Sequence, residues 1–222
     1  TLRCAPQVIG AVWDTLDWHD SVAMTELNAA TDNPIFPGGD VLVLHGGNFM
    51  GQHVGLASDA LGNAVCVLAG LAERQMARLT DERLNRGLPA FLHQGPAGLH
   101  SGLMGAQVTA TARLAEMRTV GPASVQSIST NGANQDVVSM GTIAARLTQD
   151  KLITLVQIQA ILAIAVAQAI DLRRAEVPDR AFSNAAMALH AVVREISEEI
   201  VADRSMASDI SAVARIMGTV SI

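Results

Sequence analysis

The feature that most constrains the fold is a run of nineteen residues, 152–170, that contains no charged side chain. The run lies inside the longest helical pattern of the chain, residues 139–173, in which apolar residues recur at three- and four-residue steps. At 1.5 Å per residue, a helix of this length is about 50 Å long. Such a helix must bury its apolar surface either in a membrane or in the centre of a large helical bundle.

The composition of the run favours the bundle. Three glutamines and a threonine interrupt it, and alanines are frequent along it. A membrane span of this length usually carries a belt of aromatic residues at its ends, and none flanks this run. Small side chains also let neighbouring helices approach closely. We therefore predict a buried bundle helix and no membrane partner.

Helical periodicity continues through most of the remaining chain. The fold class expected is all-α, a long-helix bundle with short loop or hairpin segments. Glycine pairs around a short β-branched run predict a loop with a small hairpin over residues 35–49. Besides the long helix, helices are expected over residues 6–29, 52–79, 103–118, 182–202 and 208–217.

Composition removes several functional classes. Half of the 222 residues are hydrophobic, which excludes intrinsic disorder, and the net charge of −6 argues against a nucleic-acid surface. The two cysteines, Cys4 and Cys66, form no disulfide framework, and no metal-ligand spacing appears. With no apolar signal segment at the start, a cytoplasmic location is expected. The chain has no tyrosine, so a phenolic base would have to come from elsewhere.

Five motifs occur in one order along the chain. They are Leu2-Arg3-Cys4-Ala5-Pro6-Gln7, Asn28 through Asp32-Asn33-Pro34, His45-Gly46-Gly47-Asn48-Phe49, Glu73-Arg74, and Asn131 through Asn134-Gln135-Asp136. Together they resemble the C-terminal part of the aromatic amino acid ammonia-lyases, which include histidine, phenylalanine and tyrosine ammonia-lyases and related aminomutases. The phrases Gly51-Gln52-His53, Leu84 through Pro89 and Gly95 through Leu99 are most similar to bacterial tyrosine ammonia-lyases.

The resemblance implies elimination of ammonia from an aromatic amino acid, and a bundle of the histidine ammonia-lyase and fumarase-like type. The family's electrophile is 4-methylidene-imidazol-5-one (MIO), which forms from an internal Ala-Ser-Gly. This chain has no Ala-Ser-Gly, and the family's tyrosine base also precedes the part matched here. We therefore expect a C-terminal portion, inactive alone, with no catalytic residue of its own.

The same resemblance implies how this portion is organised. Residues 1–173 are expected to be the C-terminal part of the helical-bundle domain, and residues 174–222 a helical segment packed on it. The implied partners are the N-terminal part of the same protein and further copies, in a homotetramer with shared active sites.

Five residues are predicted to bind the substrate: Arg3, Phe49, Asn131, Asn134 and Gln135. A guanidinium binds a carboxylate in a bidentate way, and the family uses the residue matching Arg3 for the α-carboxylate of the substrate. The ring matching Phe49 packs against electrophile and substrate in the family. The alternative interpretation is structural: an exposed arginine near a chain end, and a loop phenylalanine anchored in the core.

The three amides are predicted to bind the amino acid or to hold the oxygen of the electrophile. The alternative is that they cap turns and helices, as asparagine often does. Within the family, histidine lyases carry an acid at the position of Gln135, and plant phenylalanine lyases carry one at Asn131. Neutral amides at both positions favour a tyrosine substrate and p-coumarate as the product. Asn33 and Asn48 are interpreted as residues that hold loops in place.

Two further readings of the sequence stay open. Within the enzyme class, the chain fits a tyrosine or phenylalanine 2,3-aminomutase or a histidine ammonia-lyase. From a different class, a non-catalytic helical assembly subunit fits a chain that holds neither electrophile nor phenolic base.

Overall fold

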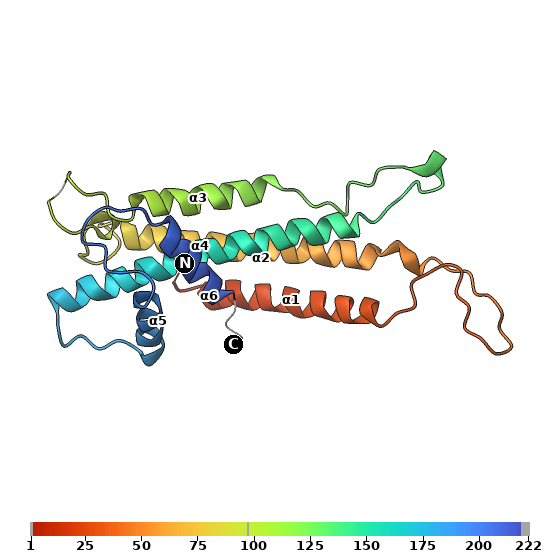
Figure 1. Ribbon diagram of the computed structural model, residues 1–222, viewed down its shortest axis with the longest axis horizontal. Helices are drawn as coiled ribbons and strands as arrows, with labels where there is room; N and C mark the ends of the chain where they lie inside the picture. The colour runs from red at the N-terminus through yellow and green to blue at the C-terminus, as the bar shows by residue number, and fades with distance from the viewer. Residues whose placement is uncertain (1, 97, 219–222) are drawn as a thin grey trace. The chain divides into compact units, whose positions relative to one another are not determined.

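A computed structural model describes residues 2–96 and 98–218, which leaves Ala97 of the Gly95–Leu99 motif and the last four residues of the predicted C-terminal segment outside it. The described residues form helices joined by loops, with β-structure limited to isolated bridges (Figure 1). The predicted all-α class is confirmed. The helices are α1 (Ala5–Leu27), α2 (Gln52–Thr80), α3 (Met104–Thr119), α4 (Gly141–Glu176), α5 (Asn184–Arg194) and α6 (Ala207–Met217), with short 3-10 turns η1 (Asn48–Met50), η2 (Ala90–Leu92) and η3 (Asn131–Ala133).

The chain divides into two compact units. Unit 1 comprises Thr1–Ala5, Leu68–Arg118 and Ile153–Ile222, and unit 2 comprises Pro6–Val67 and Thr119–Leu152. The two long helices, α2 and α4, are each divided between the two units. The domain boundary expected after residue 173 stays a prediction.

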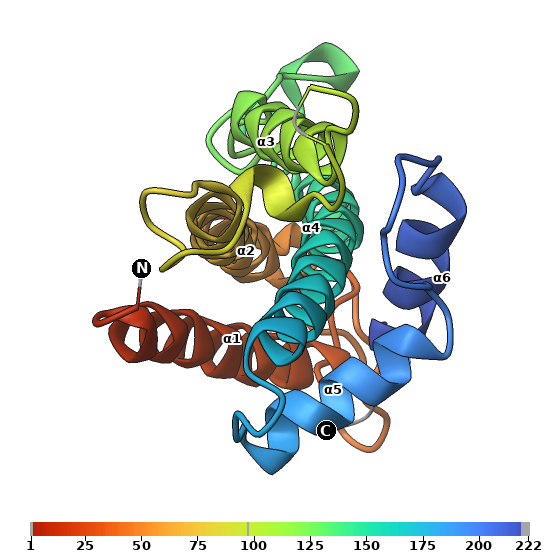
Figure 2. The ribbon, with the colours of Figure 1, turned by 90° about the vertical axis from the view of Figure 1, so that its left-hand side faces the viewer.

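The part of α4 in unit 1 lies at the centre of that unit. α2, α3, α5 and α6 surround it, as the end-on view shows (Figure 2). Eleven of the nineteen residues of the uncharged run are buried: Leu155, Ile158, Ala160, Ile161, Ala163, Ile164, Ala165, Ala167, Gln168, Ala169 and Ile170. The prediction of a buried bundle helix is confirmed, because protein side chains shield this apolar surface.

Length and composition alone do not separate such a helix from a membrane span. Among the described residues, two segments, Asn48–Thr80 and Gly141–Glu176, are long and apolar enough to cross a membrane. In each, 56% of the most apolar window is already buried within the protein. That degree of burial is typical of a core helix.

In unit 2, α2 and α4 run parallel and approach closely at two glycines. Gly55 lies against Ser139 and Gly141, and seven residues later Gly62 lies against Thr148. The hydroxyl of Thr148 donates a hydrogen bond of 2.7 Å to the carbonyl of Ser58 between these two points. The absence of side chains at both glycines therefore sets the distance between the two helices.

The helix predicted over residues 182–202 was wrong in its second half, because α5 ends at Arg194. The reason is a buried side chain on α4. Gln168 is completely buried, and its amide pairs with the backbone of Ile200, accepting from the N–H at 3.0 Å and donating to the carbonyl at 3.1 Å. Arg194 also donates to the carbonyl of Ser197 at 2.8 Å. At Ile200, the tertiary hydrogen bonds to Gln168 therefore take the place of helical ones.

The hairpin expected near residue 40 is present in a minimal form. Isolated antiparallel bridges join Ile35 to Leu44 and Gly38 to Val41. The side-chain oxygen of Asn33 accepts a hydrogen bond of 3.0 Å from the N–H of Gly46 and so ties the base of the loop together. The interpretation of Asn33 as a residue that holds its loop is confirmed.

We predict that Gly55→Ala destabilises the protein although alanine is the better helix former. An added Cβ would lie 2.7 Å from the carbonyl oxygen of Ser139, so the two helices must move apart. We expect a loss of about 1–3 kcal/mol in the free energy of unfolding, measured by urea denaturation of the complete protein.

The matched control is Gly105→Ala in α3, where no heavy atom lies within 4 Å of an added Cβ. It should leave the stability unchanged or raise it by up to about 1 kcal/mol. A Gly55→Ala protein as stable as the wild type would contradict the close approach of α2 and α4.

Candidate functional site

The candidate site is built on the loops that precede α2 and α4 in unit 2. The two helices begin at the same end: the carbonyl oxygen of Gly51 lies within 3.4 Å of the position that a Cβ on Gly141 would take. The loop before α2 and the loop before α4 both extend beyond this end (Figure 1). Because helix N-termini carry unpaired N–H groups and a positive partial charge, two such ends together favour negative charge nearby.

Phe49 lies in the loop before α2. It is the middle residue of η1, and the left-handed Gly51 (φ +66°) turns the chain from η1 into the helix. Its side chain is 58% exposed, so the alternative that it anchors the loop in the core of this chain is wrong. An aromatic ring held at the start of a helix and left uncovered is available to a ligand or to another part of the protein.

The loop before α4 contains a left-handed turn of three residues. Asn131, Gly132 and Ala133 have φ values of +54°, +63° and +65°, and Met140 at the end of the loop has +54°. A non-glycine residue in this conformation costs about 1–2 kcal/mol. Such strain is concentrated at functional sites, because the surrounding structure must hold it in place.

Hydrogen bonds close this turn and present the predicted amides. The backbones of Thr130 and Gln135 pair across it, at 3.0 Å and 3.4 Å, and the N–H of Asn134 donates to the carbonyl of Asn131 at 3.1 Å. The Thr130 hydroxyl donates to the side-chain oxygen of Gln135 at 3.2 Å. Asn131, Asn134 and Gln135 are all exposed. One strained turn thus carries three neutral amides on its surface.

Sequence reasoning missed the residues that support this loop. Asp59 on α2 is 9% exposed, and its carboxylate accepts a hydrogen bond of 2.7 Å from the N–H of Ser124. At the far end of the loop, the Ser127 hydroxyl accepts from the N–H of Val138 at 2.8 Å. Asp59 lies between Gly55 and Gly62 on α2, and no pattern in the sequence distinguishes it from a surface carboxylate.

The loop also borders an open cavity beside α4. The cavity has a volume of about 480 Å³ and lies between the loop and the first turns of the helix. Its walls combine polar side chains of the loop, Gln126 and Ser127, with apolar ones that include Ile143 and Leu147 of α4. The loop is therefore held by its polar contacts to α2 and within itself, not by dense packing against α4.

Arg3 lies in a turn immediately before α1, in unit 1, whereas the other four predicted residues belong to unit 2. Its side chain is exposed, and within residues 2–96 and 98–218 no hydrogen bond or ion pair engages the guanidinium. The group is therefore free to bind a carboxylate in the bidentate geometry that arginine favours.

Comparison with known proteins relates this site to a family. The model of the family described as "Aromatic amino acid lyase" matches residues 1–195, most of the chain. The chain belongs to the aromatic amino acid lyase family. The match covers unit 2, most of unit 1 and all five predicted site residues, and it confirms the resemblance carried by the sequence motifs.

Curated relatives of this chain include enzymes with different reactions. The chain is 64% identical to a tyrosine ammonia-lyase of Cereibacter sphaeroides over 96% of its own length and 41% of that enzyme. It is 46% identical to an MIO-dependent tyrosine 2,3-aminomutase of Streptomyces globisporus, over 96% of the chain and 39% of that enzyme. The chain thus spans about two fifths of the length of these relatives.

Solved structures of the family have the same fold. The tyrosine aminomutase from Streptomyces globisporus matches with a TM-score of 0.91 at 46% identity, over 97% of this chain and 40% of that one. The histidine ammonia-lyase from Trypanosoma cruzi matches with a TM-score of 0.90 at 37% identity, over 98% and 42% of the two chains. The bundle of the histidine ammonia-lyase type is confirmed.

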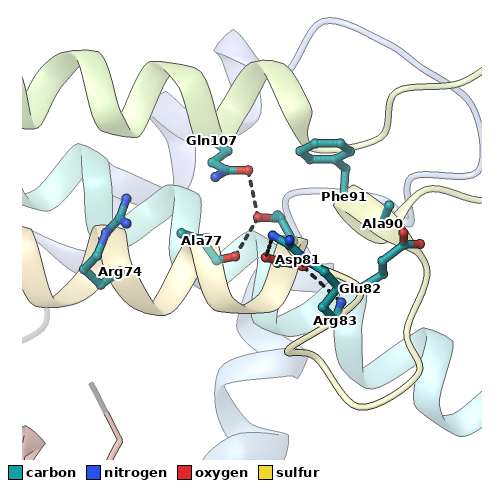
Figure 3. Close-up of a pocket in the computed structure, with 9 residues that line it drawn as sticks. Arg74, Ala77, Asp81, Glu82, Arg83, Ala90, Phe91 and Gln107 are labelled. Atoms are coloured by element: carbon teal, nitrogen blue, oxygen red, sulfur yellow. Dashed lines mark hydrogen bonds and ion pairs between the residues drawn. The ribbon is translucent and has the colours of Figure 1, made fainter.

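A second cavity lies in unit 1 beside the last two turns of α2, which carry the Glu73-Arg74 motif. It has a volume of about 610 Å³, and Arg74, Asp81, Arg83, Phe91 and Gln107 are among the residues that line it (Figure 3). Both of its arginines form ion pairs, Arg83 with Asp81 and Arg74 with Glu73. The pairing favours a structural role for this motif.

Glu73 is the buried member of the motif. Its side chain is 2% exposed, and its carboxylate accepts hydrogen bonds from Arg74 and, at 2.8 Å, from the hydroxyl of Thr111 on α3. The hydrogen bond from Arg74 holds the pKa of Glu73 below its usual value of 4.5, against the opposing effect of burial. The carboxylate therefore joins α2 to α3 in its charged form.

We predict that in Glu73→Gln the free energy of unfolding depends less on pH in the acid range than it does in the wild type. Because the pKa of Glu73 is lower in the folded protein, its contribution is present above the unfolded value of 4.5 and is lost as the pH falls through the folded value. Urea denaturation of the complete protein between about pH 3 and 6 should show a slope smaller by up to about 1.4 kcal/mol per pH unit, the equivalent of one proton.

Glu176→Gln provides the control for loss of a carboxylate, because the Glu176 side chain is 54% exposed. If Glu73→Gln kept the wild-type slope over the whole acid range, the charged form would not be the one that joins the two helices.

Proposed function

We propose that the complete protein eliminates ammonia from an aromatic L-amino acid, with tyrosine as the preferred substrate and p-coumarate as the product. The observation that carries this proposal is 64% identity to a tyrosine ammonia-lyase over 96% of the chain. Three relatives, two ammonia-lyases and an aminomutase, act on tyrosine according to their names.

In the elimination, the bond between Cβ and hydrogen breaks, and its electron pair forms the double bond between Cα and Cβ. The amino group leaves as ammonia with the electron pair of the C–N bond. Arg3 would hold the α-carboxylate, since its guanidinium is exposed and has no partner among the described residues. A carboxylate fixed at two oxygens limits the rotation of the substrate and so aligns the bonds that break.

The family's MIO group, when bound, supplies the electrophile of the reaction. This chain contains no Ala-Ser-Gly to form it and no tyrosine to act as a base, so both are assigned to the part of the protein outside this chain. The exposed amides of Asn131, Asn134 and Gln135 offer N–H donors that suit the oxygen of such a group, and the Phe49 ring offers an uncovered aromatic face.

The adjacent N-termini of α2 and α4 also support a role for this chain in the proposed elimination. Their positive ends would stabilise negative charge that develops near the loops. The residues of this chain therefore bind, orient and provide electrostatic stabilisation.

The choice of tyrosine rests on the neutral amides at Asn131 and Gln135. Within the family, histidine lyases carry an acid at the second position, and plant phenylalanine lyases carry one at the first. Hydrogen bonds to a phenol discriminate strongly against substrates that lack it, because an unpaired buried polar group is costly. A tyrosine or phenylalanine 2,3-aminomutase is the second candidate, favoured by the 46% identity to a tyrosine 2,3-aminomutase.

We also propose that the protein is a cytoplasmic homotetramer with shared active sites, and that α1 contributes to its assembly. None of the residues of α1 is buried in the structure. Large apolar side chains on it are exposed, including Trp13 (62%), Trp18 (47%) and Leu27 (79%). An exposed surface of this kind is typical of an interface, either with the remaining part of the same protein or with another copy.

We expect the complete protein to release p-coumarate from tyrosine faster than it releases cinnamate from phenylalanine or urocanate from histidine. The products are followed by their ultraviolet absorbance, and β-amino acids are sought by chromatography. A β-amino acid as the main product would assign the protein to the aminomutases. If the complete protein converts none of the three amino acids, the enzyme proposal fails and the interpretation as a non-catalytic helical assembly subunit remains.

We predict that Arg3→Ala in the complete protein raises KM strongly and lowers kcat, because it removes a charge-assisted bidentate contact. Such contacts contribute about 1.5–3 kcal/mol, so kcat/KM should fall by at least about tenfold. The control is Arg3→Lys, which keeps the charge without the bidentate geometry. Its kcat/KM should lie between those of the wild type and Arg3→Ala. If KM were unchanged in Arg3→Ala, Arg3 would not be the residue that binds the α-carboxylate of the substrate.

A further inference from the structure

We propose that Thr130 is a positioning residue for the reaction, which fixes the orientation of the Gln135 amide. The proposal rests on the proposed function, because it takes Gln135 as a substrate-site residue. Its basis is the hydrogen bond of 3.2 Å from the Thr130 hydroxyl to the side-chain oxygen of Gln135.

The backbone keeps the two side chains together. Thr130 and Gln135 form an isolated antiparallel bridge, in which each N–H donates to the other residue's carbonyl, at 3.0 Å and 3.4 Å. Between them lies the left-handed turn of Asn131, Gly132 and Ala133. The bridge closes a strained segment, so the two residues face each other in one fixed arrangement.

Threonine at position 130 holds its hydroxyl in one direction because its side chain is β-branched. Thr130 has an extended backbone, with φ −136° and ψ 174°. A β-branched side chain has few accessible χ1 rotamers, so its hydroxyl keeps one direction with little loss of entropy. A serine at this position would retain the donor with more rotational freedom, and a valine would retain the shape without the donor.

The contact determines what Gln135 offers to a ligand. An amide carries an acceptor oxygen and a donor NH2 group, and either can face outward. Because the Thr130 hydroxyl engages the oxygen, the two N–H donors of Gln135 remain for the substrate. Donors suit an acceptor oxygen, such as that of a phenol or carboxylate. Without the hydroxyl, the amide would rotate between donor and acceptor orientations, and only a fraction of molecules would be ready to bind.

Kinetics of the complete protein with tyrosine test this role. We expect Thr130→Val to lower kcat/KM by about fivefold, the equivalent of one neutral hydrogen bond, and Thr130→Ser to stay within about twofold of the wild type. Thr109→Val is the matched control, because the Thr109 hydroxyl donates to Gly105 within its own helix. Wild-type kinetics in Thr130→Val, or equal losses in the valine and serine variants, would overturn the proposal.

A double-mutant cycle separates positioning from a general effect on the loop. If Thr130 acts through Gln135, then Thr130→Val should have no further effect on kcat/KM in a Gln135→Ala background. The same fivefold loss in that background would overturn the proposal, because the threonine would then act independently of the amide.

A crystal structure of the complete Thr130→Val protein gives a readout that needs no activity. We expect one conformation of the Gln135 side chain in the wild type and several in the variant. An identical single conformation in both would overturn the proposal even in an active enzyme. If the wild type proves inactive on aromatic amino acids, the proposed function fails, while this comparison still decides whether Thr130 orients Gln135.

Discussion

The close approach of α2 and α4 is the constraint on which the candidate site depends. Glycine at positions 55 and 62 allows backbone and short polar side chains of α4 to lie where a Cβ would collide with them. The approach aligns the starts of the two helices and thereby sets where their preceding loops end. A larger residue at Gly55 would change the distance between the helices and the origin of both loops together.

The loop before α4 shows how the fold maintains strain. Three consecutive left-handed residues are unfavourable by themselves, and the bridge between Thr130 and Gln135 closes them at the base. The buried carboxylate of Asp59 anchors the start of the same loop through the N–H of Ser124. Polar contacts replace tight packing here, because a cavity of about 480 Å³ lies beneath the loop. Polar anchoring leaves the amides at the surface, where a ligand can reach them.

Burial is uneven in this member of the aromatic amino acid lyase family. Eleven residues of α4 between Leu155 and Ile170 are buried, whereas α1 exposes two tryptophans and the predicted site residues are exposed. The chain spans about two fifths of the length of the relatives compared with it. In the proposed enzyme, the remaining part of the protein or another copy would cover these groups, and the residues of this chain would contribute orientation and hydrogen bonding.

The sequence by itself determined the all-α class, the long helices and the family, because apolar periodicity and local motifs are encoded in neighbouring residues. It predicted the starts of α2 and α4 within two residues. It also identified five candidate site residues by resemblance, and the roles of these residues stay predictions. It failed at residues 195–202, where Gln168 captures the backbone of Ile200 from another helix. It also missed Asp59 and Thr130. Only the tertiary structure decided these contacts, because each depends on a backbone position that is set by packing or by strain rather than by the local sequence.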